Sequence, residues 1–547
     1  MADDLDNAAI ADSLERYASL LDLSGSGYYN VRAYRRAAEL IRPLPTPVAE
    51  LVRQGKVQTL RGIGPGIARV LEELVARGEI ARARELEGEV EPELVGLGRF
   101  LGLGPQRAVE LGRALGVRTA GEFRAAIEAG RLTSVPGVGP KTEEKLRTAL
   151  AREHEARPPR GLLLNRARDL VGSLAAQLDG HIAGDPRRWA DVSNQLAVVC
   201  ATRRPGQVLD RFATLPLIVA VIDRRPDRAI GVTVEGIPVE IVVAPPERFG
   251  SELVLATGSP EFIASLGSLP HAADEESLFR ELGREFVPPE LREAGWARSL
   301  EARVPSLVQV GDVRGDLHVH SDWSDGKATV LEMAEAARDR GYDYLAICDH
   351  TKNVRVVPGL DGDDVRRQAE EIAAANGRVA PFRILRGIEC DILPDGSLDL
   401  PDDVLAELDW VQASVHAGQR ASADAITKRV VDALRHPAVS CLSHPKGRII
   451  NHRPENALDL ERAFEVMVEE GVAVEVNGLP DRLDLRDAYV RLAIEARVPI
   501  VCSTDAHSTR GLGNMQLSVA TARRGGAAAA DVLNTRPLGG LPLGSRR

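Results

Sequence analysis

Short apolar runs that end in a histidine or a carboxylate recur through the second half of the chain. They have the length of buried strands, and the segments between them, such as ATVLEMAEAARDRG, carry apolar residues at helical spacings of three and four. These strand and helix patterns alternate from Asp312 to about Leu538, which indicates parallel strands joined by helical crossovers. We therefore predict an α/β barrel here, with its chemistry at the carboxyl ends of the strands.

The ends of these predicted strands supply nine side chains that can bind metal ions. In DLHVHSDWSDG, His318 and His320 lie two residues apart and leave the same face of one strand. Six of the chain's eleven histidines follow apolar runs in this way, too many for ordinary hydrogen-bonded strand ends. Imidazole together with carboxylate suits Zn²⁺, Mn²⁺ or iron, whereas Mg²⁺ alone takes oxygen ligands. The candidate ligands are His318, His320, Asp325, His350, Glu389, His416, His444, Asp505 and His507.

The first third of the chain repeats a glycine-rich turn that leads into a helical pattern. The copies are LRGIGPGIARVLEELVARG, LGLGPQRAVELGRALG and LTSVPGVGPKTEEKLRTAL. One such turn would be unremarkable, but glycine amides at a helix N-terminus can approach a phosphate, and three copies favour helix-hairpin-helix contacts with the DNA backbone. The predicted DNA-binding residues of these motifs are Gly62, Gly64, Gly66, Gly102, Gly104, Gly137, Gly139 and Lys141.

The charge of the chain is unevenly spread. The formal net charge is -11 at pH 7, yet residues 31–70 carry eight basic and two acidic side chains, a local excess of +6. This arm is a candidate phosphate-binding face, with a solvated helix surface as the alternative. The five cysteines show no CxxC spacing, no apolar run reaches membrane-spanning length, and the acidic start does not resemble a signal peptide. We expect a reduced, cytoplasmic setting without membrane contact.

The order of these regions resembles that of the bacterial family X DNA polymerases over nearly the whole chain, and the C-terminal region resembles their PHP domain, named for polymerase and histidinol phosphatase. The resemblance implies a multidomain α/β protein with a distorted (β/α)7 barrel. It also implies that Arg32, Arg35 and Arg36 of NVRAYRRAAELI face DNA phosphate. The expected parts are an N-terminal helical DNA-binding domain (1–88), a helical fingers-like domain (89–155), a nucleotidyltransferase-like palm (160–246), a thumb-like domain (247–302) and the PHP domain (312–547).

The same resemblance implies three divalent ions, Mn²⁺ or Zn²⁺ or iron, and hydrolysis of a phosphoester by the nine ligands. Lys352, Arg448 and Arg510 follow ligand motifs and are candidates for holding a substrate phosphate, with solvated loop cations as the alternative. The implied ligand sets are His318, His320, Glu389 and Asp505 for one ion, Glu389, His416 and His444 for a second, and Asp325, His350 and His507 for a third.

The palm departs from the family pattern. A working family X palm needs a Gly-Ser, two acidic residues one apart on a strand, and a third on a neighbouring strand to hold Mg²⁺. In this sequence Asp185 replaces the serine, the acidic pair falls on Asn194 and Leu196, and the third position is Glu240. Because leucine cannot bind Mg²⁺, we expect a palm that keeps its fold but neither binds Mg²⁺ nor polymerises.

Several functions remain open at this stage. The motifs favour a 3'-5' exonuclease in DNA repair that acts as a monomer on gapped, primer-template or single-stranded 3' ends. A phosphatase for a small phosphate ester would use the same ligands but would not need three hairpin motifs, and a DNA-binding scaffold would not need nine ligands. Gly258 and Ser259, in a stretch that resembles the family's nucleotide-side turn, and Arg187 with Arg188 after Gly184 keep residual polymerase activity as an alternative. We expect the tail after Pro537 to be mobile.

Overall fold

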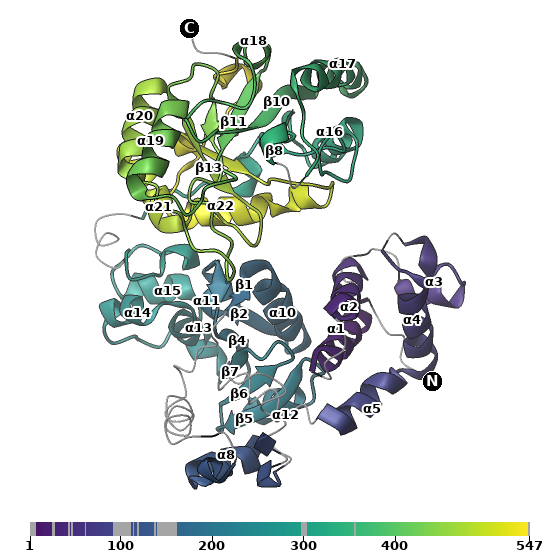
Figure 1. Cartoon of the computed structure of the whole chain (residues 1–547). Coiled ribbons are helices and arrows are strands. Elements are labelled where there is room, and N and C mark those ends of the chain that lie inside the picture. Colours follow the sequence, from purple (N-terminus) through teal and green to yellow (C-terminus); the bar gives the residue numbers. More distant parts are fainter. Residues whose placement is uncertain are drawn as a thin grey trace. The chain divides into compact units, whose positions relative to one another are not determined.

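The computed structural model divides into two compact units, with the boundary near residue 285. The first unit holds the N-terminal helices and the palm, and the second holds the barrel together with Leu163–Asn165 and Arg188–Asp191. No helix among the described residues is long and apolar enough to cross a membrane. The structure describes residues 7–23, 28–41, 44, 47–60, 62–90, 111–112, 114–117, 120–135, 138, 161–296, 304–354 and 357–544 (Figure 1).

Seven parallel strands form the sheet of the second unit, in the order β14-β13-β12-β11-β10-β9-β8. The two ends of this sheet meet, because Val319 and Ala506 form a parallel bridge and the His320 N–H donates to the Ala506 carbonyl at 2.9 Å. The nearly closed barrel confirms the predicted (β/α)7 fold. The strands are β8 (Gly315–Val319), β9 (Tyr344–Ile347), β10 (Arg383–Asp391), β11 (Trp410–Ser414), β12 (Cys441–Leu442), β13 (Ala473–Asn477) and β14 (Ile500–Ser503).

Helices surround these strands (Figure 1). Their starts follow local sequence: Thr329 and Glu332 form a capping box at α16, and Asp361 and Asp364 form another at α17. The strands read as continuous apolar runs because both faces are covered, one by helices and the other by the barrel interior. The helices are α16 (Val330–Asp339), α17 (Gly362–Val379), α18 (Asp402–Leu405), α19 (Ala423–Leu434), α20 (Leu460–Glu470), α21 (Asp487–Ala496) and α22 (Met515–Arg524), with 3-10 turns η6 (Val310–Asp312), η7 (Lys352–Val354) and η8 (Gly511–Asn514).

The C-terminal tail is ordered through Gly544, so the expectation of a mobile tail is wrong. Leu541 is 8% exposed and packs in the barrel core with Trp410 and Tyr344. The Gly544 N–H donates to the Asp409 carbonyl at 2.9 Å. Burial of an apolar tail side chain therefore outweighs the flexibility suggested by its glycines. The segment forms η9 (Ala529–Asp531), η10 (Leu533–Thr535) and η11 (Leu538–Gly540).

The N-terminal part of the first unit is helical, with a core that includes Ile10, Ile41 and Leu71. Its first predicted hairpin is present: a turn containing Gly62, at φ +107°, leads through Gly64 into α4. The glycines and the lysine predicted in the second and third hairpins lie outside the described residues. The helices are α1 (Asn7–Leu23), α2 (Tyr28–Ile41), α3 (Val48–Arg53), α4 (Pro65–Arg77), α5 (Ala81–Val90) and α8 (Ala120–Glu128), with η1 (Val57–Thr59) and η2 (Arg131–Ser134).

The palm is a mixed five-stranded sheet in the order β2-β4-β7-β6-β5, in which β4 and β7 are parallel. A separate two-stranded sheet pairs β1 with β3. The strands are β1 (Leu162–Leu163), β2 (Gly180–Ala183), β3 (Val192–Ser193), β4 (Leu196–Ala201), β5 (Ile218–Arg224), β6 (Arg228–Thr233) and β7 (Pro238–Ala244). The helices are α10 (Leu164–Gln177), α11 (Gly184–Arg187), α12 (Pro205–Ala213), α13 (Phe249–Thr257), α14 (Pro260–Leu266) and α15 (Glu275–Glu281), with η3 (Pro246–Arg248) and η4 (Pro289–Leu291).

The register of the palm corrects the predicted polymerase positions by one residue. Leu196 is fully buried in the core formed with α10 and α12, whereas Ala197 is paired with Glu240 on β7. Because side chains alternate along a strand, Ala197 shares the face of Glu240 and Leu196 does not, and the position two residues before Ala197 is Gln195. Neither Gln195 nor Ala197 is acidic, so the corrected register also lacks the carboxylate pair.

Candidate metal centre

Glu389, near the end of β10, is the common neighbour of five histidines. Its Oε1 lies 2.8 Å from His444 Nε2 and 3.3 Å from His416 Nε2. Its Oε2 lies 2.8 Å from His350 Nδ1 and 3.5 Å from His318 Nε2. Oε2 is also 3.7 Å from His320 Nε2. A carboxylate with different imidazoles at each oxygen is suited to bridging two metal ions.

The remaining predicted ligands complete the cluster. His320 Nε2 lies 3.0 Å from Asp505 Oδ1, and His507 Nε2 lies 3.2 Å from Asp325 Oδ2. The structure brings all nine predicted ligands together, although the groups within 4.8 Å differ slightly from the implied sets. These groups are His318, His320 and Asp505; His350, Glu389 and His416; and His320, Asp325, His350 and His507.

The buried polar atoms of this cluster fit bound cations. Ring nitrogens of several of its histidines, and Glu389 Oε2, are inaccessible to solvent and make no hydrogen bond of good geometry, although some lie close to one another, such as His350 Nδ1 and Glu389 Oε2 at 2.8 Å. Leaving such atoms unsatisfied is costly, and a divalent ion that accepts their lone pairs would remove that cost. The atoms are His318 Nε2, His320 Nδ1 and Nε2, His350 Nδ1, His416 Nε2, His444 Nδ1 and Glu389 Oε2.

The electrostatics of the cluster favour cations as well. Although burial alone would raise the pKa of Glu389, neighbouring histidines, His350 foremost, hold it well below its usual 4.5. Burial would lower the pKa of His416, but Glu389 raises it to about 9. Burial, with the charges of His507 and His350, lowers the pKa of His320 to about 3. Without metal, protons on residues such as His416 therefore balance the carboxylates, and metal ions would displace them.

Glu475, on β13, orients the first of these histidines. It is fully buried, and its Oε1 accepts a hydrogen bond from His318 Nδ1 at 2.6 Å. The Ser443 and Ser503 hydroxyls donate to its oxygens at 2.8 and 2.5 Å. A proton held on Nδ1 leaves the Nε2 lone pair of His318 directed at the cluster. Our reading of the sequence missed this residue, yet the alternation in AVEVN, with Glu475 between valines, could have revealed an inward-facing carboxylate.

Replacing Glu475 with glutamine is expected to weaken metal binding by about 10- to 100-fold, since an amide orients the imidazole less strongly. Competition with a chromogenic chelator would measure the loss. Asn477 also points a side-chain amide at the cluster, donating to Asp505 Oδ2 at 2.9 Å. An unchanged metal affinity in the Glu475→Gln variant would show that Glu475 contributes packing and does not orient His318.

Two of the three predicted phosphate-binding cations are held by other groups. Arg448 is 9% exposed and donates to the carbonyls of Arg482 and Leu483 at 2.7 and 2.6 Å. Lys352 is exposed but hydrogen-bonded to Asp361. Arg510 is exposed just before η8.

The predicted DNA-binding arginines, Arg32, Arg35 and Arg36, lie on α2, where Arg36 is exposed. Their helix buries Val31, Ala37 and Ala38, and Arg35, which is partly buried on the same side, lies 3.9 Å from Glu235 Oε2. The arrangement is that of an amphipathic helix with Arg36 on its exposed side.

Comparisons with known proteins match three regions of the chain. Residues 5–80 match a helix-hairpin-helix domain, residues 97–152 a SAM-like helix-hairpin-helix tandem, and residues 316–478 a PHP domain. A probable phosphatase of Aliivibrio fischeri is 28% identical over 219 residues, covering 38% of this chain and 82% of the phosphatase. A probable phosphatase of Acetivibrio thermocellus is 30% identical over 209 residues, covering 36% of this chain and 81% of its own length.

A further match covers almost the full length of both chains. The DNA polymerase/3'-5' exonuclease PolX of Bacillus subtilis (strain 168) is 33% identical over 556 residues, which is 96% of this chain and 96% of that protein. The PHP match covers the strands that carry most of the cluster, and PHP domains are metal-dependent phosphoesterases. With helix-hairpin-helix regions at its N-terminus and this identity over its whole length, the chain belongs to the bacterial family X DNA polymerases of the polymerase/3'-5' exonuclease type.

Proposed function

We propose that this protein is a DNA-binding, metal-dependent exonuclease that removes nucleotides from 3' ends in DNA repair, and that its palm does not polymerise. The observation that carries the proposal is a contrast between two sites. In the barrel, six histidines and two aspartates gather around Glu389, and several of their ring nitrogens are buried. In the palm, Glu240 has no carboxylate beside it on the neighbouring strand.

The palm side chains that resemble nucleotide-binding groups are engaged elsewhere. Arg187 donates to both carboxylate oxygens of Glu275 at 2.6 and 2.7 Å and to the Thr257 hydroxyl at 3.1 Å. The Ser259 hydroxyl caps α14 by accepting from the Phe262 N–H at 3.2 Å. A charged bidentate pair must be broken before Arg187 can bind a triphosphate, which opposes nucleotide binding.

The barrel supplies the chemistry in this proposal. Mn²⁺ or Zn²⁺ bound by the nine side chains would make a hydroxide available near neutral pH and offset the charge on a phosphoryl group. Glu389 would be shared between ions. Glu475 keeps His318 in the tautomer that offers Nε2 to the cluster. The burial of His318, His320 and Glu389 keeps these ligands out of bulk water and holds them in place.

The first hairpin would hold the DNA backbone. Gly64 and Gly66 are exposed at the N-terminus of α4, and a Cβ atom added to either would meet nothing within 4 Å. A phosphate can approach their backbone amides closely only while no side chain covers them.

The double substitution Gly64→Ala and Gly66→Ala is expected to leave the fold intact but to weaken DNA binding several-fold. The loss of a phosphate contact should also lower the slope of log Kd against log salt by about one. Fluorescence anisotropy with a labelled gapped duplex at several salt concentrations measures both effects.

Gly206 offers a matched control, because it also follows a proline at the start of a helix, α12, and also faces open space. The Gly206→Ala variant should bind DNA like the unaltered protein. An unchanged slope in the Gly64/Gly66 double variant would remove the first hairpin from the DNA path.

A phosphatase acting on a small phosphate ester is the second candidate, favoured by the similarity of part of the chain to probable phosphatases. The two functions differ in what they need from the N-terminal helices. Phosphatase activity on a small ester should be indifferent to the Gly64/Gly66 substitutions and to competing DNA, whereas exonuclease activity should fall with DNA affinity.

A further inference from the structure

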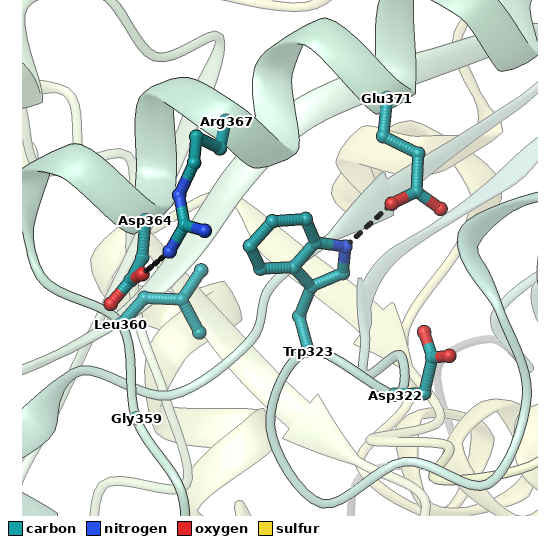
Figure 2. A pocket seen from close by; sticks show the side chains of 7 residues that line it. All are labelled: Asp322, Trp323, Gly359, Leu360, Asp364, Arg367 and Glu371. Carbon is teal, nitrogen blue, oxygen red and sulfur yellow. Dashed lines mark hydrogen bonds and ion pairs between the residues drawn. The ribbon is translucent and has the colours of Figure 1, made fainter.

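A pocket of about 420 Å³ is lined by residues of the loop between His320 and Asp325, of the segment before α17 and of α17, none of which the proposed chemistry uses (Figure 2). We propose that this pocket receives the nucleobase of the 3'-terminal nucleotide, an inference that rests on the proposed exonuclease function. Its lining residues are Asp322, Trp323, Gly359, Leu360, Asp364, Arg367 and Glu371.

One wall of the pocket belongs to a loop that carries candidate metal ligands, and a second wall is hydrogen-bonded to another such segment. Trp323 lies in the loop between His320 and Asp325. Leu360, on the opposite segment, donates its N–H to the His350 carbonyl at 2.8 Å. A nucleotide in the pocket would therefore lie next to the ligand cluster, with its phosphate reaching toward the metals.

The close pairing of the Leu360 segment with the segment after His350 requires a glycine. A Cβ atom at Gly359 would lie 2.3 Å from the Thr351 carbonyl oxygen, so any other residue would push the two segments apart. The pocket wall and the segment after His350 are thus fixed to each other by backbone contacts.

The third wall is helix α17, which holds the indole of Trp323 in place. The indole N–H donates to Glu371 Oε2 at 2.8 Å, and the Arg367 guanidinium carbon lies 5.7 Å from the ring centroid. Figure 2 shows the ring between the Arg367 and Glu371 side chains, which come from α17. The hydrogen bond to Glu371 fixes the ring at its edge and Arg367 lies over one face, so a base would stack on the other face.

The charges of the lining favour a base over a phosphate. Asp322, Asp364 and Glu371 bring three carboxylates and Arg367 one cation, so a phosphate inside the pocket would be repelled. Carboxylates instead accept hydrogen bonds from the amino groups of adenine, cytosine and guanine, which thymine lacks.

A cation at the margin completes the arrangement. Lys352 is 57% exposed, and its Nζ lies 3.5 Å from Asp364 Oδ2. It follows His350 by two residues, so it lies where the segment with the metal ligand meets the pocket. A phosphate that approaches Lys352 would have to replace its hydrogen bond to Asp361.

The test compares two oligonucleotides that differ only at the 3' end, one with deoxyadenosine and the other with an abasic tetrahydrofuran residue. Because stacking of one base on an aromatic ring raises affinity appreciably, the unaltered protein with Mn²⁺ should remove deoxyadenosine with about tenfold higher kcat/KM. In the Trp323→Ala variant this ratio should fall to near one, with Trp323→Phe in between. Trp296→Phe, which alters another partly buried tryptophan, should keep the full ratio.

Inhibition gives a second readout that needs no DNA. Deoxyadenosine 5'-phosphate should inhibit hydrolysis of bis(4-nitrophenyl) phosphate at about tenfold lower concentration than deoxyribose 5-phosphate, and Trp323→Phe should reduce this difference. The base subsite alone would be overturned in two cases. In the first, the unaltered protein trims both oligonucleotides with a kcat/KM ratio near one; in the second, both Trp323 variants keep the full ratio. If deoxyadenosine 5'-phosphate inhibits preferentially but no DNA is trimmed, the base subsite is supported and the exonuclease function is contradicted. If there is neither preferential inhibition nor trimming, both proposals are contradicted.

Discussion

Replacing His320 or Asp505 with alanine is expected to abolish removal of 3'-terminal nucleotides while DNA affinity stays unchanged. His320 Nε2 and Asp505 Oδ1 are 3.0 Å apart, and both side chains are buried at the centre of the cluster. Loss of a ligand would remove several kcal/mol of charge stabilisation, which corresponds to a rate reduction of roughly a thousandfold. Single-turnover digestion of a 3'-labelled oligonucleotide, together with anisotropy for binding, measures the two properties separately.

His452 provides the control for this experiment. It is an exposed histidine of the same domain, and the His452→Ala variant should trim DNA like the unaltered protein. If trimming persists in the His320 and Asp505 variants, the active centre is not the barrel cluster. If DNA affinity falls with activity, the substitutions have damaged more than the metal site.

Replacing Glu389 with glutamine is expected to destabilise the metal-free protein by roughly 3 kcal/mol near pH 6 and by little near pH 9.5, because the loss of a buried charge leaves its partners uncompensated. Glu389 raises the pKa of buried His416 from 6.5 to about 9. Because the pKa of His416 is raised in the folded state, its protonation stabilises the folded protein fully below pH 6.5. This contribution disappears as the pH rises through about 9. The difference in unfolding free energy between the unaltered protein and the Glu389→Gln variant should therefore also decrease as the pH rises through about 9.

Urea unfolding with a chelator at both pH values measures this effect. An exposed glutamate of the same domain, Glu407, gives the control variant Glu407→Gln, for which only a small change is expected at either pH. Equal destabilisation of the Glu389→Gln variant at the two pH values would assign the role of Glu389 to packing instead of charge.

The barrel and its ligands were predictable because their signals are local and repeated. Each ligand follows its own apolar run, and parallel strands bring such ends to one edge. His318 and His444 are 126 positions apart in the chain, yet the strand pattern alone predicted that they lie close together. In the structure their ring centroids are 6.2 Å apart. The starts of α16 and α17 can also be inferred from sequence, because Thr329 and Asp361 are of the residue types that cap helices.

The errors arose where the deciding contact is distant in the sequence. Leu196 and Ala197 cannot be told apart by composition, and only pairing with β7 shows which of them faces Glu240. Leu541 lies in a glycine-rich tail that resembles a mobile end, and its burial depends on barrel residues far away in the sequence. Glu475 was overlooked because its run ends in an asparagine instead of a metal ligand.

The central claim is that the barrel is the active centre and that the palm does not polymerise. Incubation of the purified protein with a 5'-labelled primer on a gapped template, with Mn²⁺ and with or without deoxynucleotides, tests both parts at once. We predict that the primer is shortened in both conditions and that the His320→Ala variant leaves it intact. Extension of the primer when deoxynucleotides are present would contradict the account.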